Sequence, residues 1–127
     1  MRKHHWIGRK PNPDKYFGFL YLITNNLSGR MYIGKKQYWK YKKKKKDKEN
    51  DWAFYTGSSA ELNEDIHKHG RINFEFRIIK NYVSRGGLTY GEANQQHKRD
   101  VLTKPHKDGR LYYNKQIGAI RFIPKEF

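Results

Sequence analysis

The sequence predicts an α+β fold in which a small central antiparallel sheet, made of an N-terminal hairpin and a third strand, is flanked by helices. Three observations predict it. Residues 17–34 have the pattern of two strands joined by a turn, residues 58–70 and 89–102 that of two capped helices, and residues 72–83 that of a strand between them. The 127 residues suffice for one domain with tails.

The composition indicates a folded, strongly basic domain. Lys and Arg number 28 against 12 Asp and Glu, a net charge of +16, which is typical of a protein that binds a polyanion. Ten Tyr, seven Phe and three Trp favour a packed core over a disordered basic tail. The absence of Cys excludes disulfides and thiolate zinc sites. No stretch resembles a signal peptide or a membrane span, so we expect an intracellular, cytoplasmic protein. No amphipathic helix with a bulky apolar face accompanies the lysines, so nucleic acid is a better partner than a membrane.

Residues 1–15 are predicted to form a basic arm ahead of a single domain over residues 16–127. The arm contains Pro11 and Pro13 and shows no hydrophobic period. It either becomes ordered on binding or only increases solubility.

The clearest element is a hairpin. Residues 17–24 (FGFLYLIT) are aromatic or β-branched, residues 25–29 (NNLSG) have turn chemistry, and residues 30–34 (RMYIG) resume a strand. Because the first strand is apolar at nearly every position, we expect it to be buried on both faces in the interior of the sheet.

A lysine-rich insertion over residues 35–50 follows. Nine Lys and one Asp between residues 35 and 48 give a net charge of +8. Such residues do not pack against one another, so a flexible segment projecting from the fold is expected. It is either a solvated loop or a surface for nucleic-acid phosphates, with Tyr38, Trp39 and Tyr41 available for stacking. The candidate DNA-binding lysines are Lys40, Lys42, Lys43, Lys44 and Lys45.

The first helix has clear start and stop signals. Ser58 is a candidate N-cap with Glu61 three residues later, Leu62 and Ile66 share one face, and Gly70 ends the helix.

The third strand and the second helix complete the fold. Ile72 to Val83 alternates apolar and polar residues, as a strand does. After the break at residues 86–87 a helix is predicted from Thr89 to Leu102, with Thr89 and Glu92 as a capping pair. Residues 111–124 are expected to be extended or turn-like.

Two short motifs lie on the hairpin. Residues 19–21 (FLY) and 32–34 (YIG) resemble the two half-motifs of the GIY-YIG nuclease superfamily, the second intact and the first with its glycine, Gly18, one place early. The chain is similar, from about residue 16 to 122, to the bacteriophage stand-alone and homing endonucleases of that superfamily. The matching downstream residues are Trp52, Tyr55, Gly57, Ser58, Ser59, Leu62, Ile66, His69, Gly70, Phe74, Ile78, Ile79, Glu92, Tyr113 and Asn114.

The resemblance implies a DNA endonuclease that uses Mg²⁺ or Mn²⁺ and leaves 5′-phosphate and 3′-hydroxyl ends. It places Tyr21 and Tyr32 on the side from which water attacks the phosphate. It also makes Glu92 the metal ligand and puts Asn114 beside the scissile phosphate. Each residue also has a structural explanation. The tyrosines could be core aromatics, Glu92 could close a capping box, and Asn114 could be a turn residue.

Phosphodiester hydrolysis also needs cations and water activation. Lys35 and Lys36 either lower the pKa of a tyrosine, so that it serves as a base, or hold the phosphate. Ser58 and Ser59 are candidate phosphate contacts at a helix start, or ordinary caps.

The chain departs from the family pattern in one place. Most members carry an arginine in a helix shortly after YIG, but here no Arg occurs between Arg30 and Arg71. Lysine does not reproduce the planar guanidinium. Either a lysine substitutes (Lys36, Lys40 or Lys42), or Arg71 or Arg85 folds into the site, or the enzyme is impaired. Arg71 is therefore also a candidate DNA-binding residue.

The expected partner is DNA, most simply double-stranded, bound by a monomer or a homodimer. Two other functions remain open: a catalytically inactive DNA-binding module of the same fold, and a basic RNA-binding protein. Convergence of Tyr21, Tyr32, Lys36 and Glu92 on one basic cleft distinguishes the enzyme, and the catalytic interpretation fails if Glu92 lies far from the tyrosines.

Overall fold

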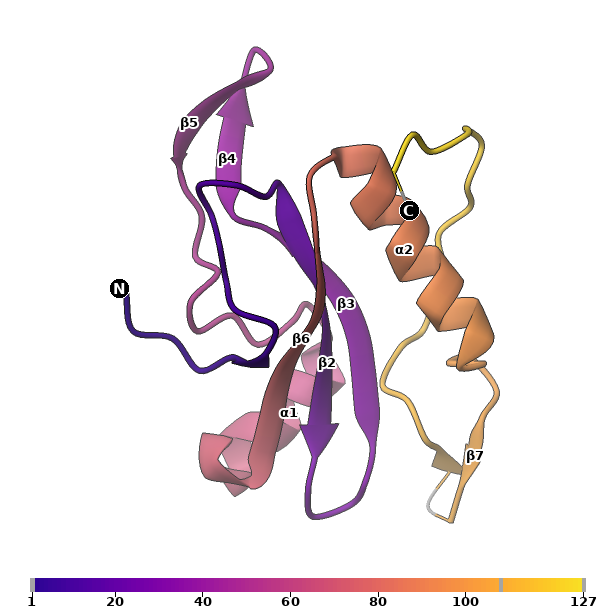
Figure 1. The fold of residues 1–127 in the computed structure, drawn as a ribbon. Coiled ribbons are helices and arrows are strands. Elements are labelled where there is room, and N and C mark those ends of the chain that lie inside the picture. Colours follow the sequence, from indigo (N-terminus) through magenta and orange to yellow (C-terminus); the bar gives the residue numbers. More distant parts are fainter. Residues whose placement is uncertain (1, 108, 127) are drawn as a thin grey trace.

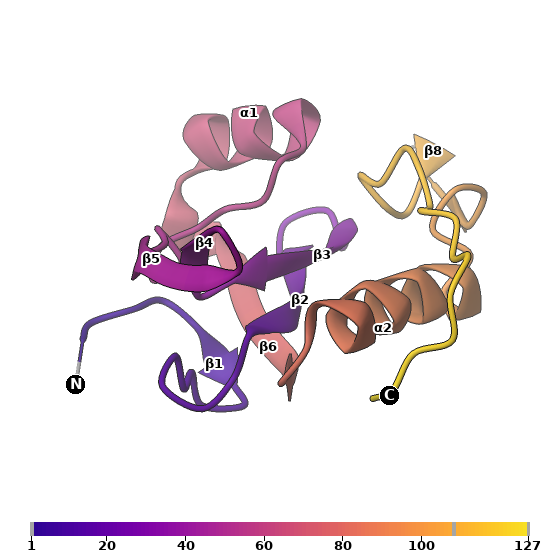
Figure 2. The ribbon, with the colours of Figure 1, turned by 90° about the horizontal axis from the view of Figure 1, so that it is seen from above.

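The computed structural model describes residues 2–107 and 109–126, and it confirms the α+β class (Figure 1). Its central sheet has the strand order β1-β6-β2-β3, with β1 parallel to β6 and the other pairs antiparallel. The four strands are β1 (Ile7–Gly8), β2 (Gly18–Asn25), β3 (Met31–Gln37) and β6 (Phe74–Tyr82). The helices α1 (Ala60–His69) and α2 (Arg85–Lys98) cover opposite faces of this sheet (Figure 2).

The predicted hairpin is confirmed as β2 and β3, and β2 lies in the sheet interior. Side chains of β2 alternate between two cores, as the period of a strand requires. Phe19, Tyr21 and Ile23 pack with Leu62 of α1. Leu20, on the other face, packs with Leu88 of α2. The continuous apolar run therefore reflects burial on both faces, as expected.

The lysine-rich insertion projects from the fold, but it is a hairpin rather than an irregular loop (Figure 1). Strands β4 (Trp39–Lys42) and β5 (Lys45–Glu49) pair antiparallel, with the left-handed residues Lys43 and Lys44 at the turn. The base is anchored by Tyr38, which is fully buried, and by the indole N–H of Trp39, which donates to Pro13 O at 2.7 Å. Aromatic residues between the lysines thus give the segment its structure.

The N-terminal arm also differs from expectation because it packs on the domain. Trp6 is only 5% exposed, and its indole N–H donates to Trp52 O at 2.7 Å. Strand β1 adds to the edge of β6. These contacts join residues about 46 and 70 positions apart in the sequence. A local hydrophobic pattern therefore does not predict them.

Both helices start at residues other than those predicted. The cap of α1 is Ser59, whose side chain accepts from Leu62 N, whereas the prediction was Ser58; Gly70 ends the helix as expected. Helix α2 begins after Ser84, so the two glycines at 86–87 lie in its first turn and do not break it. It ends at Lys98 rather than Leu102.

The remaining segments are short or extended. A 3₁₀ turn (Arg71–Asn73) precedes β6, which ends at Tyr82, one residue before the predicted Val83. Strands β7 (Pro105–His106) and β8 (Gly109–Arg110) form a small ribbon. Residues 111–126 then run alongside β3 and α2 without a helix. Within the described residues, no helix combines the length and the apolar character that crossing a bilayer requires.

The packing of His5, in the N-terminal arm, should make the stability of the fold depend on pH. His5 stacks on Phe76 at 3.9 Å, and its Nδ1 lies 2.7 Å from a guanidinium nitrogen of Arg71. Because a guanidinium only donates, this His5 nitrogen accepts and the ring is neutral. Burial, with the charge of Arg71, lowers the pKa of His5 from 6.5 to about 4.

A group that must stay neutral stabilises the fold fully above its unfolded pKa, here 6.5, and that stabilisation is lost as the pH falls toward 4. We expect the free energy of unfolding, measured with denaturant, to fall over this interval. The slope should be smaller in His5→Phe, which keeps the stacking without a titratable ring, and unchanged in His67→Gln, an exposed control on α1. An equal slope in His5→Phe and the parent would contradict the assignment.

Candidate active site

A concave pocket of about 360 Å³ brings the two candidate tyrosines and the candidate metal ligand together. We call it the tyrosine–glutamate pocket. It lies between β3, α2, the segment before α1 and the C-terminal segment. Its described lining residues are Tyr21, Tyr32, Gly34, Lys35, Ser58, Glu92, Gln96, Asn114, Lys115, Gln116 and Gly118. Of the four residues expected to converge, Tyr21, Tyr32 and Glu92 line this pocket and Lys36 does not.

The hairpin register explains why the tyrosines meet. Tyr21 pairs with Gly34, and Tyr32 pairs with Ile23, so the two tyrosines are diagonal neighbours on one face. Their ring centroids are 6.2 Å apart. A Cβ at position 34 would collide with the Tyr21 hydroxyl, so the glycine of YIG provides the space for that hydroxyl.

Both tyrosines are protonated in this environment at neutral pH. Burial raises the pKa of Tyr21 well above 10, and Tyr32, Tyr55 and Glu92 add to the effect. Burial also raises the pKa of Tyr32, against the opposing hydrogen bond with Ser58. The lysines therefore do not turn either phenol into a ready base. Tyr21 is 1% exposed, whereas Tyr32 is half-buried and so is the better placed to meet a substrate.

Glu92 does not cap its helix. Thr89, its expected capping partner, lies in the second turn of α2, and its hydroxyl accepts instead from Lys35 Nζ at 3.0 Å. The same ammonium is 3.8 Å from a Glu92 oxygen. Burial raises the pKa of Glu92, and Lys35 partly offsets this. A partly buried carboxylate facing a cavity, with one distant ion pair, is free to bind a cation.

The donor set fits a hard divalent cation. Gln96 lies one turn after Glu92 on α2 and also lines the pocket, and its Oε1 is buried without a hydrogen-bond partner. Within the described residues, no group of three or more His, Asp or Glu side chains is arranged to hold a metal ion. Oxygen ligands from one carboxylate and one amide suit Mg²⁺ or Mn²⁺, which keep several waters and bind substrate phosphates.

Asn114 lines the pocket but has a clear structural task. It is 3% exposed; its Nδ2 donates to Ile33 O at 2.8 Å, and its Oδ1 accepts from Ile33 N at 3.1 Å. The side chain thus pairs with the outer edge of β3 and holds the C-terminal segment there. One Nδ2 hydrogen remains for a ligand. A contact to the scissile phosphate stays a prediction.

Ser58 and Ser59 have different partners and different roles. Ser58 Oγ lies 3.1 Å from the hydroxyl of Tyr32 and belongs to the pocket. The side chain of Ser59 is committed to the cap of α1.

The structure places other candidates outside the tyrosine–glutamate pocket. Lys36 Nζ binds Asp51 at 2.8 Å and lies over the Tyr55 ring at 3.8 Å. Arg71 binds His5 and Phe54 O, so its guanidinium holds the N-terminal arm. Arg85 does not line the pocket either.

The cations that do line it are Lys35 and Lys115. Lys115 and Gln96 were missed by the sequence analysis. Two features of the sequence could have identified them. Lys115 directly follows Asn114, and Gln96 lies four residues after Glu92, on the same face of a helix. The hairpin lysines Lys40, Lys42, Lys43, Lys44 and Lys45 lie exposed on β4, β5 and their turn.

Comparison with known proteins gives one matching family model. The family is described as "Putative endonuclease segE, GIY-YIG domain", and it matches residues 2–117. Two relatives come from Enterobacteria phage T4. "Putative endonuclease segC" is 28% identical over 115 residues, which is 91% of this chain and 50% of the relative. "Putative endonuclease segE" is 28% identical over 104 residues, 82% of this chain and 43% of the relative.

The chain spans about half the length of the curated relatives it matches. No solved structure matches it.

Proposed function

Because the chain belongs to the family of the segE GIY-YIG endonuclease domain, we propose that it is a metal-dependent DNA endonuclease that hydrolyses phosphodiester bonds to 5′-phosphate and 3′-hydroxyl ends. The observation that carries the proposal is the convergence of Tyr21, Tyr32 and Glu92 in one pocket with two lysines. The two tyrosines come from the β2–β3 hairpin, and Glu92 comes from α2, which is far from that hairpin in the sequence.

In the proposed mechanism the scissile phosphate enters the tyrosine–glutamate pocket. Lys35 and Lys115 neutralise the charge that builds up on the phosphoryl oxygens. Glu92, with Gln96 beside it, would hold Mg²⁺ or Mn²⁺, which when bound stabilises charge on the leaving oxygen. Lys35 and Lys115 would take the place of the arginine that the resemblance to the superfamily leads one to expect after YIG.

Tyr32 orients the attacking water. The scheme has Tyr32 donate its phenolic hydrogen to Ser58 Oγ, 3.1 Å away, which leaves a lone pair of the phenolic oxygen to accept from a water. Tyr21 lies deeper, and its protonated hydroxyl would be a hydrogen-bond donor to a substrate oxygen. In this scheme Tyr32 positions the nucleophile without first losing its own proton.

The charge distribution supports DNA as the substrate. The exposed lysines of β4 and β5 extend the basic surface beyond the pocket. Such contacts bind phosphates and carry no base information, so a modest sequence preference and a strong salt dependence are expected.

The decisive experiment incubates the chain with supercoiled plasmid DNA at low salt. We expect nicked or linear products with Mg²⁺ or Mn²⁺ and none with EDTA. DNA ligase should reseal the nicks without prior phosphorylation, because the ends carry 5′-phosphates. Plasmid binding without cutting under all of these conditions would favour the inactive DNA-binding module. RNA binding much tighter than DNA binding at equal salt would favour the RNA-binding protein.

A further inference from the structure

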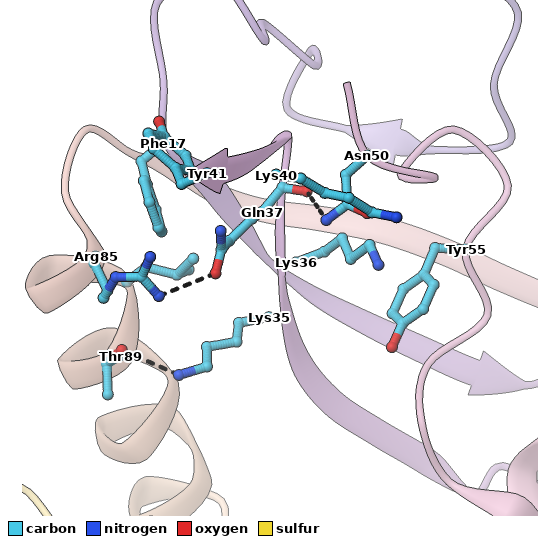
Figure 3. A pocket seen from close by; sticks show the side chains of 11 residues that line it. Phe17, Lys35, Lys36, Gln37, Lys40, Tyr41, Asn50, Tyr55, Arg85 and Thr89 are labelled. Atoms are coloured by element: carbon cyan, nitrogen blue, oxygen red, sulfur yellow. Dashed lines mark hydrogen bonds between the residues drawn. The ribbon is translucent and has the colours of Figure 1, made fainter. Parts of the chain in front are cut away.

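The structure has a second cavity, of about 560 Å³, whose lining side chains are drawn in Figure 3. It lies between β3, the base of the β4–β5 hairpin and the first turns of α2. Lys35 lines both cavities, so they are adjacent. The described lining residues are Phe17, Lys35, Lys36, Gln37, Lys40, Tyr41, Asn50, Tyr55, Arg85, Leu88 and Thr89. We call this cavity the lysine–arginine pocket.

Its charge is of one sign. Three lysines and one arginine line it, and no carboxylate is among its described lining residues. The carboxylates that contact two of these cations lie outside the lining of the cavity. Asp51 pairs with Lys36 at 2.8 Å, and Glu92 is 3.8 Å from Lys35. The lining of this cavity therefore favours an anion over a cation.

Arg85 is held in place by neutral neighbours. Its guanidinium lies 5.1 Å from the centroid of the Phe17 ring, and that ring packs against Tyr41 at 5.4 Å. One of its N–H groups donates to Gln37 Oε1 at 3.2 Å, as Figure 3 shows. The other N–H groups of the planar guanidinium are left for a ligand. This geometry suits bidentate binding of a phosphate, which a lysine does not provide.

We propose that the lysine–arginine pocket is a phosphate subsite that binds the backbone phosphate next to the scissile one on the same DNA strand. Arg85 is its specific ligand, and Lys35, Lys36 and Lys40 supply further charge. Lys35 sits between the two phosphates and contacts both. The proposal rests on the proposed function, because the scissile phosphate defines the neighbouring position.

The test uses a probe with two phosphates on one nucleoside, thymidine 3′,5′-bisphosphate, and compares it with the 5′- and 3′-monophosphates by calorimetric titration at low salt with EDTA. The parent chain should bind the bisphosphate at least about 10-fold more tightly than either monophosphate, which is about 1.4 kcal/mol. Arg85→Gln, at an exposed residue, should lose this preference. Arg99→Gln makes the same charge change at the far end of α2 and should keep it.

Equal binding of bisphosphate and monophosphates by the parent, or the same loss in Arg99→Gln as in Arg85→Gln, would overturn the proposal. The measurement does not depend on cleavage, so the two proposals fail separately. A chain that cuts plasmid but shows no bisphosphate preference retains the nuclease function and loses the subsite. A chain that shows the preference but never cuts retains a two-phosphate site and loses the nuclease function.

Discussion

Replacing Glu92 with glutamine is expected to lower the rate of DNA cleavage by about 10²–10³-fold or more, the size of effect seen when one preorganised electrostatic group is lost. Glu92 is the sole carboxylate among the described lining residues of the tyrosine–glutamate pocket. The substitution keeps the shape of the side chain but removes the charge that attracts a divalent cation. Excess metal should therefore not restore the rate fully.

The same variant should fold and bind DNA as well as the parent. Burial disfavours the ionised form of Glu92, so a neutral amide costs the fold little or nothing. Thermal unfolding and DNA binding in EDTA check this. Glu64→Gln, which removes an exposed carboxylate on α1, is the matched control and should cleave normally. Cleavage by Glu92→Gln within about 10-fold of the parent would remove Glu92 from the mechanism.

The parts of the site that the sequence predicted are those governed by local rules and motif order. Strand alternation and the turn at residues 25–29 fix the hairpin, and the hairpin sets Tyr21 and Tyr32 on one face. The same alternation puts Lys36 on the face of the tyrosines, where it binds Asp51, and Lys35 on the face of α2, where it reaches Glu92 and so lines the tyrosine–glutamate pocket. Treating Lys35 and Lys36 as equivalent ignored the period of the strand.

The errors come from contacts between residues that are distant in the sequence. The two glycines at 86–87 suggested a break, but Glu126 accepts from the backbone N–H groups of Val83 and Ser84 at the start of α2, and an added Cβ at Gly87 would meet its carboxylate. Trp6 enters the core through Trp52 in the same way. Neither partner can be identified from a local pattern, so the start of α2 and the packing of the arm were not predictable.

Gly34→Ala is expected to lower both the stability of the fold and the rate of cleavage. The added Cβ would collide with the Tyr21 hydroxyl, and the Tyr21 ring, 1% exposed, packs against Tyr32 and Tyr55, so it does not move without displacing them. Gly57, whose φ is +83°, also lies near this hydroxyl, since a Cβ added there would be 3.4 Å from it. Such overpacking costs about 1–3 kcal/mol. Because the ring of Tyr21 must shift, and with it Tyr32, we also expect cleavage to fall by at least about 10-fold.

Two further variants distinguish the collision with the Tyr21 hydroxyl from a general effect of replacing glycine with alanine. Gly118→Ala adds the same methyl to the lining of the same pocket, where it meets no described atom within 4 Å, and should be as stable and active as the parent. Gly34→Ala combined with Tyr21→Phe removes the hydroxyl and should regain part of the stability, measured by denaturant unfolding, without regaining cleavage. That outcome would assign the loss of stability to the collision and the loss of cleavage to Tyr21. If Gly34→Ala behaves like Gly118→Ala, the glycine does not determine the position of Tyr21.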